Sequence, residues 1–162
     1  FCLSRGLGDV YKRQGLSYAL QDEVRAAVAS GEVDATSPIG RLADDDRVDP
    51  RVVLTAAASG DADALLATSR VGATLARVVG VLGSMYDPTR VIVCGAVAES
   101  VAPVIAAARE VVPTELHLPA PEILASTLGA EVVSIGAVTT ARMAAREVAV
   151  PLLAERRLSA VG

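Results

Sequence analysis

Residues 90–98 of this chain read Arg90-Val91-Ile92-Val93-Cys94-Gly95-Ala96-Val97-Ala98. The β-branched run over 90–94 predicts a short buried strand, with Cys94 as a small buried apolar residue, and the glycine after it predicts a turn. Ser100 is placed to cap a helix that runs to about Val112, and residues 122–125 predict a second strand. A strand, a helix and a strand in this order predict a βαβ unit with parallel strands and a right-handed crossover. We therefore expect an α/β fold that is rich in helix.

The helix between the two predicted strands has one apolar face. Its expected core positions are Val101, Ile105, Ala108 and Val112. Pro103 falls in the first turn, where the missing N–H has no partner within the helix. Pro113 is expected to end this helix.

Upstream, residues 62–86 predict the longest helix of the chain, capped by Asp61 and broken at Asp87-Pro88. Larger apolar residues form one stripe along it: Val71, Leu75, Val78, Leu82 and Met85. Small residues form a second stripe: Gly72, Ala76, Gly80 and Ser84. Because Gly costs about 1 kcal/mol relative to Ala inside a helix, two glycines on one stripe indicate tight packing against another backbone.

Three further segments complete the expected organisation. Residues 16–30 predict a helix from apolar residues at every fourth position, and residues 50–58 predict a short helix capped by Asp49. The segment 32–49 between them is expected to be a polar loop. The last helix is expected to start near Glu131, run past Ala145, and kink or end at Pro151.

Composition restricts the class of protein. The chain has 162 residues, 52% of them hydrophobic and 2% aromatic, so we expect one domain, or a piece of one, with an aliphatic core. The net charge of −4 leaves no basic surface for nucleic acid, so DNA binding would need a different segment. Residues 71–86 are the most apolar helical stretch, but they contain Arg77 and are shorter than the ~20 residues of a membrane span. We expect no membrane contact and a cytoplasmic location.

The first residues differ from the rest. Residues 4–14 resemble the translated sequence of an adaptor used in preparing sequencing libraries, and Lys12 is the only lysine of the chain. We therefore expect 1–14 to be an artefactual leader and 15–162 to be the truncated C-terminal lobe of a longer protein. Without the leader, 12 basic and 18 acidic side chains remain, which gives a charge of −6.

Three segments together resemble the C-terminal half of the ROK family, named for repressors, open reading frames and kinases. Residues 84–93 resemble the family's N-L-L-D-P-x-x-I-V-I run, residues 94–98 lie where the family has G-G-G-V, and residues 128–137 resemble L-G-x-x-A-x-x-x-G-A. Gly60-Asp61 matches the family's Gly-Asp before the long helix. Order and spacing agree from about residue 52 to 145.

The resemblance implies an actin-like, sugar-kinase ATPase fold of the ribonuclease H-like type, with nucleotide and sugar in a cleft between two lobes. The family's first phosphate loop, catalytic aspartate and His/Cys zinc motif belong upstream of the matched region, and this chain has none of them. We therefore expect no catalytic residue and no metal ligand here, and no kinase activity from this chain. ATP would be a cofactor only if the parent protein is a kinase.

Gly95, Ala96 and Val97 form the one candidate cofactor-binding segment. They follow a predicted parallel strand and precede a helix, a position where open α/β sheets bind ligands. In ROK kinases the matching loop is rich in glycine, so that the adenosine of the nucleotide lies against bare backbone. Here Cys94 and Ala96 replace two of the three glycines. An ordinary strand-to-helix turn remains an equal interpretation.

Two other features are interpreted without a ligand. The sole histidine, His117, has no cysteine near it, and a metal site needs three or four converging donors. Residues 44–46 are three consecutive aspartates, which without spaced ligands are typical of a solvated loop rather than a cation site.

Two functions of the parent protein stay open, with a helix-rich α/β piece of unrelated role as a third. The first is a sugar-sensing transcriptional regulator, in which this lobe senses a small sugar and a missing upstream domain binds DNA. The second is an ATP-dependent sugar kinase of the glucokinase type. The substituted glycine loop and the sequence 121–129 favour the regulator. Because the strands belong to a larger sheet, we also expect a homo-oligomer or self-association.

Overall fold

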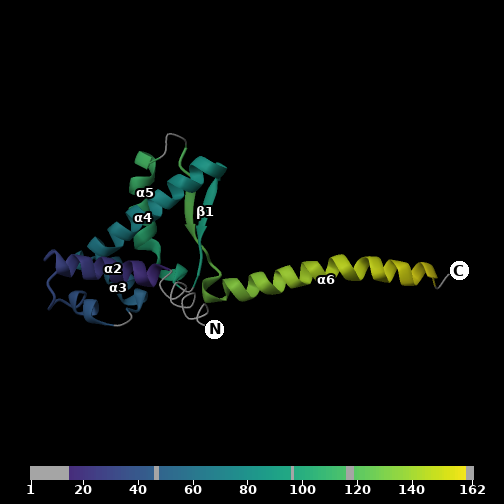
Figure 1. Cartoon of the computed structure of the whole chain (residues 1–162), viewed down its shortest axis with the longest axis horizontal. Coiled ribbons are helices and arrows are strands. Elements are labelled where there is room, and N and C mark those ends of the chain that lie inside the picture. Colours follow the sequence, from purple (N-terminus) through teal and green to yellow (C-terminus); the bar gives the residue numbers. More distant parts are fainter. Residues whose placement is uncertain (1–14, 46–47, 96, 116–118, 160–162) are drawn as a thin grey trace, which may run out of the picture.

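The computed structural model describes residues 15–45, 48–95, 97–115 and 119–159 (Figure 1). The helices are α2 (Leu16–Ala29), α3 (Pro50–Ala58), α4 (Ala62–Tyr86), α5 (Ala102–Glu115) and α6 (Val132–Ser159). Short 3₁₀ turns are η1 (Gly40–Asp44), η2 (Ala98–Ser100) and η3 (Gly129–Glu131), and the strands are β1 (Arg90–Val93) and β2 (Glu122–Ala125). The leader predicted over 1–14 and His117 lie outside the described residues.

The predicted βαβ unit is confirmed. Strands β1 and β2 pair in parallel, from Arg90 opposite Glu122 to Val93 opposite Ala125, and α5 connects them. The wider expectation of an actin-like lobe stays a prediction, because a two-stranded parallel sheet is common to many α/β folds.

The expectation that β1 is buried is wrong. Ile123 on β2 is 1% exposed, and its register partner Val91 is half-buried, so this face of the sheet joins the core. On the opposite face Ile92 is 61% exposed, and Arg90 Nε donates a hydrogen bond to Glu122 Oε2 at 3.1 Å. Cys94, predicted to be buried, is an exposed free thiol. The reason is that helices cover only one face of this short sheet. A continuous apolar run such as residues 90–94 is typical of a strand that is covered on both faces.

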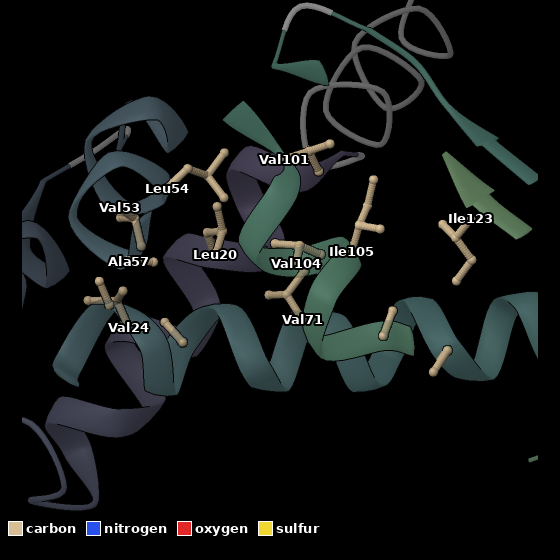
Figure 2. Close-up of a cluster of buried hydrophobic side chains, with 14 of the residues drawn as sticks. Leu20, Val24, Val53, Leu54, Ala57, Val71, Val101, Val104, Ile105 and Ile123 are labelled. Carbon is tan, nitrogen blue, oxygen red and sulfur yellow. The ribbon is translucent and has the colours of Figure 1, made fainter. Parts of the chain in front are cut away.

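The core lies where α2, α3, α4 and α5 meet (Figure 2). It is aliphatic, as the composition predicts. Its largest fully buried apolar side chains are Leu20, Val24, Val48, Val53, Leu54, Val79, Val101, Val104, Val112 and Ile123. The caps that start α3 and α4 are also confirmed: Asp49 Oδ1 accepts from the N–H of Arg51 at 3.0 Å, and Asp61 Oδ1 accepts from the N–H of Ala64 at 2.9 Å.

The small stripe of α4 faces the core, and the large stripe contributes to the core through Val71 and, in part, Leu75. Gly72, Ala76 and Gly80 are buried, whereas Val78 is 50% and Met85 66% exposed. Helix α5 lies so close that a Cβ on Gly72 would sit 2.6 Å from the Cβ of Ala107 and 2.9 Å from the carbonyl oxygen of Val104. The glycine stripe predicted this approach correctly. Bulky side chains at the positions of the small stripe would hold α5 away.

Helix α4 spans 25 residues, and by length and composition it could cross a membrane. The apolar stretch is therefore longer than the sequence interpretation allowed. Part of it is buried against the other helices of the fold, as in the core helix of a soluble protein, so its apolar character has a structural explanation. It is also not the longest helix, since α6 has 28 residues.

The segment 32–49 is more ordered than a polar loop. It contains η1, and it buries Val33, Ile39 and Val48. The buried Gln21 of α2 donates from Nε2 to the carbonyl oxygen of Asp45 at 2.7 Å, and Arg25 Nη2 donates to the same oxygen at 2.8 Å. These bonds fix the segment to α2.

Neither predicted proline stop holds. Helix α5 continues through Pro113 to Glu115, and α6 continues through Pro151 to Ser159. Helix α6 projects away from the body as a long single rod (Figure 1). Side chains 133–149 are all exposed.

Replacing Gly72 with Ala should destabilise the fold. The new methyl group would meet the backbone of α5, and overpacking of this kind costs about 1–3 kcal/mol, which exceeds the roughly 1 kcal/mol that Ala gains over Gly in a helix. Thermal unfolding followed by circular dichroism measures the loss. Gly136→Ala is the matched control: it also lies within a helix but has nothing within 4 Å, so it should not lower the midpoint. A higher midpoint for Gly72→Ala would show that α4 and α5 are not in close contact.

Replacing Arg70 with Met should make stability less sensitive to acid. Arg70 Nη2 donates to Glu32 Oε1 at 2.6 Å, and this bond, with a weaker contribution from Ser30, lowers the pKa of Glu32 below 4.5. A lowered folded pKa stabilises the protein above the unfolded pKa, and that stability is lost as the pH falls through the folded pKa. The free energy of unfolding in urea should therefore be higher for the wild type than for the variant at pH 7. This difference should be smaller at about pH 3. A difference that grows in acid would contradict the assignment; the effect is small because both side chains are partly exposed.

Candidate functional site

The loops that follow β1 and β2 meet at one edge of the sheet, because parallel strands end on the same side. The N–H of Ser126 donates to the carbonyl oxygen of Val93 at 2.8 Å, which holds the second loop against the end of β1. Ser126 Oγ then accepts from the N–H of Leu128 at 3.1 Å and turns the chain into η3. We call this edge, formed by residues 94, 95, 97–101 and 126–131, the strand-end site.

The predicted segment Gly95, Ala96 and Val97 lies in the first of these loops. Gly95 has φ +125°, a conformation that L side chains rarely adopt, and its carbonyl oxygen accepts from the N–H of Ala98 at 3.1 Å. A Cβ on Gly95 would meet nothing within 4 Å, so this glycine serves the turn and leaves open space beside it. Val97 is half-buried and packs against the core, while Ala96 lies outside the described residues.

The second loop places a glycine beside a carboxylate of the first loop. A Cβ on Gly129 would lie 2.9 Å from Oε1 of Glu99, so the bare backbone of Gly129 gives room to that side chain. Gly129 has φ +54° and is buried, and Glu99 is exposed. The glutamate from η2 and the glycine from η3 are thus neighbours although 30 residues separate them.

The charge at this edge is negative among the described residues. Glu99 and Glu131 are the acidic side chains among the described residues of the two loops. The nearest arginines in sequence are engaged elsewhere: Arg90 binds Glu122 at the opposite end of the strands, and Arg109 Nη2 donates to the carbonyl oxygen of Ile123 at 2.6 Å. The described residues of the two loops include carboxylates and no lysine or arginine, which disfavours phosphate binding. An exposed carboxylate such as that of Glu99 is instead a strong acceptor for hydroxyl groups.

A separate hollow lies between α3, α4 and α5. This groove has a volume of about 720 Å³ and is lined mostly by alanine and leucine. Its described lining residues are Ala57, Ala58, Ala62, Leu65, Leu66, Thr68, Ser69, Ala102, Pro103, Ala106, Ala107 and Glu110. Thr68 Oγ1 donates to the carbonyl oxygen of Ala64 at 2.9 Å, so its hydroxyl is already satisfied. The groove offers apolar contact and a single carboxylate, which suits an apolar partner more than a polar substrate.

The shifted pKa values belong to the turn between α2 and η1. The backbone N–H of Thr36, followed by its hydroxyl, lowers the pKa of Asp34. Glu32 and Arg70 form an ion pair that lowers the pKa of the glutamate and raises that of the arginine. These groups tie a turn to α4, so the shifts reflect structure rather than catalysis. Within the described part of the chain, no group of three or more His, Cys, Asp or Glu side chains could hold a metal ion, and Asp44 and Asp45 are exposed.

Sequence reasoning found the first loop of the strand-end site and missed the second. Glu99 belonged to no motif, and Gly129 was noted only as part of the run over 128–137 and not as part of a site. Their pairing could have been expected from the topology, because the segments after two adjacent parallel strands must lie side by side.

Comparison of the chain with protein-family models, with curated proteins and with solved structures yielded no match.

Replacing Gly95 with Ala should lower stability through backbone strain rather than through a clash. Holding a side chain at a sparsely populated backbone conformation costs about 1–3 kcal/mol. Urea unfolding measures the loss, and Ala98→Gly is a control in the same turn that changes packing but not φ. An unchanged midpoint for Gly95→Ala would mean that the turn adopts another conformation than the one described.

Proposed function

We propose that this chain is the sugar-sensing effector portion of a ROK-like transcriptional regulator that acts in the cytoplasm. One observation carries the proposal: Glu99 stands beside Gly129 at the strand-end site, where a kinase of this type would hold its nucleotide. The carboxylate repels phosphate and accepts hydrogen bonds from hydroxyl groups, which are the groups that a free sugar presents. DNA binding would belong to an upstream domain, since the chain is acidic.

A sugar kinase is the second candidate. The observation that favours it is Gly95, which keeps φ +125° and leaves open space at the end of a parallel strand. That is the geometry a backbone needs to approach a nucleotide. Against it stand the negative charge of the site and the two substituted glycines, at Cys94 and Ala96.

Expression of the protein extended upstream of Gly15 along its reading frame tests the choice. The extended protein should bind a free monosaccharide in calorimetry, change its DNA affinity on binding, and give no heat with Mg-ATP. Glu99→Gln should weaken sugar binding by about tenfold, because a hydrogen bond to a charged group is worth about 1.5–3 kcal/mol. Glu122→Gln, at the other end of β2, is the control and should leave sugar affinity unchanged.

The Ala96→Gly substitution distinguishes the regulator from the kinase through its effect on ATP binding. In a regulator it should change neither the sugar response nor ATP affinity. In a kinase it should tighten ATP binding, because one methyl group in a pocket is worth about 1–3 kcal/mol. Measurable ATP binding by the wild type that tightens in this variant, or sugar-dependent ATP turnover, would overturn the regulator and establish the kinase.

A further inference from the structure

Helix α6 presents an apolar face that no described part of the chain covers. The residues on this face are spaced alternately by four and by three positions, the spacing found in helices that pack against another surface. They are Ser134, Val138, Ala141, Ala145 and Val148, with Ala137 and Ala144 beside them. All of them are exposed, Val138 by 67% and Val148 by 62%. Arg142 borders this face one residue after its centre.

The groove between α3, α4 and α5 is the complementary surface on the same chain. It is about 720 Å³ in volume, and its walls are mostly alanine, so a helix with small side chains could approach them closely. Glu110 is the single charged residue among its described lining residues. A helix edged by Arg142 therefore matches the groove in shape and in charge.

The two surfaces do not meet within one molecule in this structure (Figure 1). Helix α6 is continuous from Val132 to Ser159 and extends away from the body (Figure 1). It has no interruption at which it could fold back over α3, α4 and α5.

We propose that α6 of one copy docks into the α3/α4/α5 groove of a second copy, with Arg142 of one copy opposite Glu110 of the other. Exchange in both directions buries both apolar surfaces twice and closes the assembly as a two-fold dimer. The dimer does not depend on the sugar-sensing function.

Sedimentation equilibrium of the full chain over a concentration series tests the docking. The wild type should show a reversible monomer–dimer equilibrium. Ala106→Glu in the groove and Ala141→Glu on α6 should each raise the dissociation constant by about tenfold or more, because each buries a charge at the interface. Both sites are exposed in the monomer, so the variants should retain the wild-type circular dichroism spectrum. Ala26→Glu on α2 and Thr139→Glu on the opposite side of α6 are the matched controls and should leave the constant unchanged.

A charge exchange identifies the pairing. Glu110→Arg alone should dimerise weakly because arginine then faces arginine, and Arg142→Glu alone should dimerise weakly because glutamate faces glutamate. Mixing the two variants should restore a 1:1 dimer, since both contacts then join opposite charges. A wild type that stays monomeric, or a mixture that stays dissociated, would overturn the proposal. An Ala141→Glu variant that dissociates while Ala106→Glu stays dimeric would overturn it in favour of α6 pairing with α6.

Discussion

The close contact between α4 and α5 at Gly72 is the constraint on which the rest of the structure depends. A backbone that lies within Cβ distance of another leaves no room for side chains between them, so α4 must present glycine and alanine there. This orientation turns the large residues Val78 and Met85 outward and brings Val71 under Val104 and Ile105 of α5. Once α5 is fixed, the ends of β1 and β2 are fixed as well, because α5 is the connection between the two strands.

The strand-end site inherits its geometry from this arrangement. The parallel register places the loops after β1 and β2 side by side, and the bond from Ser126 to Val93 holds them in contact. Glycines at 95 and 129 serve different purposes in the two loops. The first allows a positive φ beside open space, whereas the second makes room for the carboxylate of Glu99. The chemistry of the strand-end site therefore depends on the carboxylate of Glu99 and on the lack of a side chain at Gly129.

Local signals predicted the elements well, and burial less well. Asp49 and Asp61 mark helix starts by a capping bond that needs no tertiary contact, so the sequence is sufficient to place them. The burial of Ile92 and Cys94 depends on what covers the sheet, and neither β-propensity nor composition contains that information. The sequence does not show which stripe of α4 is more deeply buried, because the distance to α5 decides this. Pro113 and Pro151 show that a proline is an unreliable stop when the helix on either side is otherwise regular.

The junction between the strand-end site and α6 has a mechanical consequence. Helix α6 follows directly after η3, which contains the Gly129 that accommodates Glu99. A regular helix of 28 residues is about 42 Å long, so a tilt of about 5° at its base displaces its far end by about 4 Å. A small rotation at η3 is therefore amplified along α6. The far end of α6 moves farthest, by about 4 Å, although it lies away from the strand-end site.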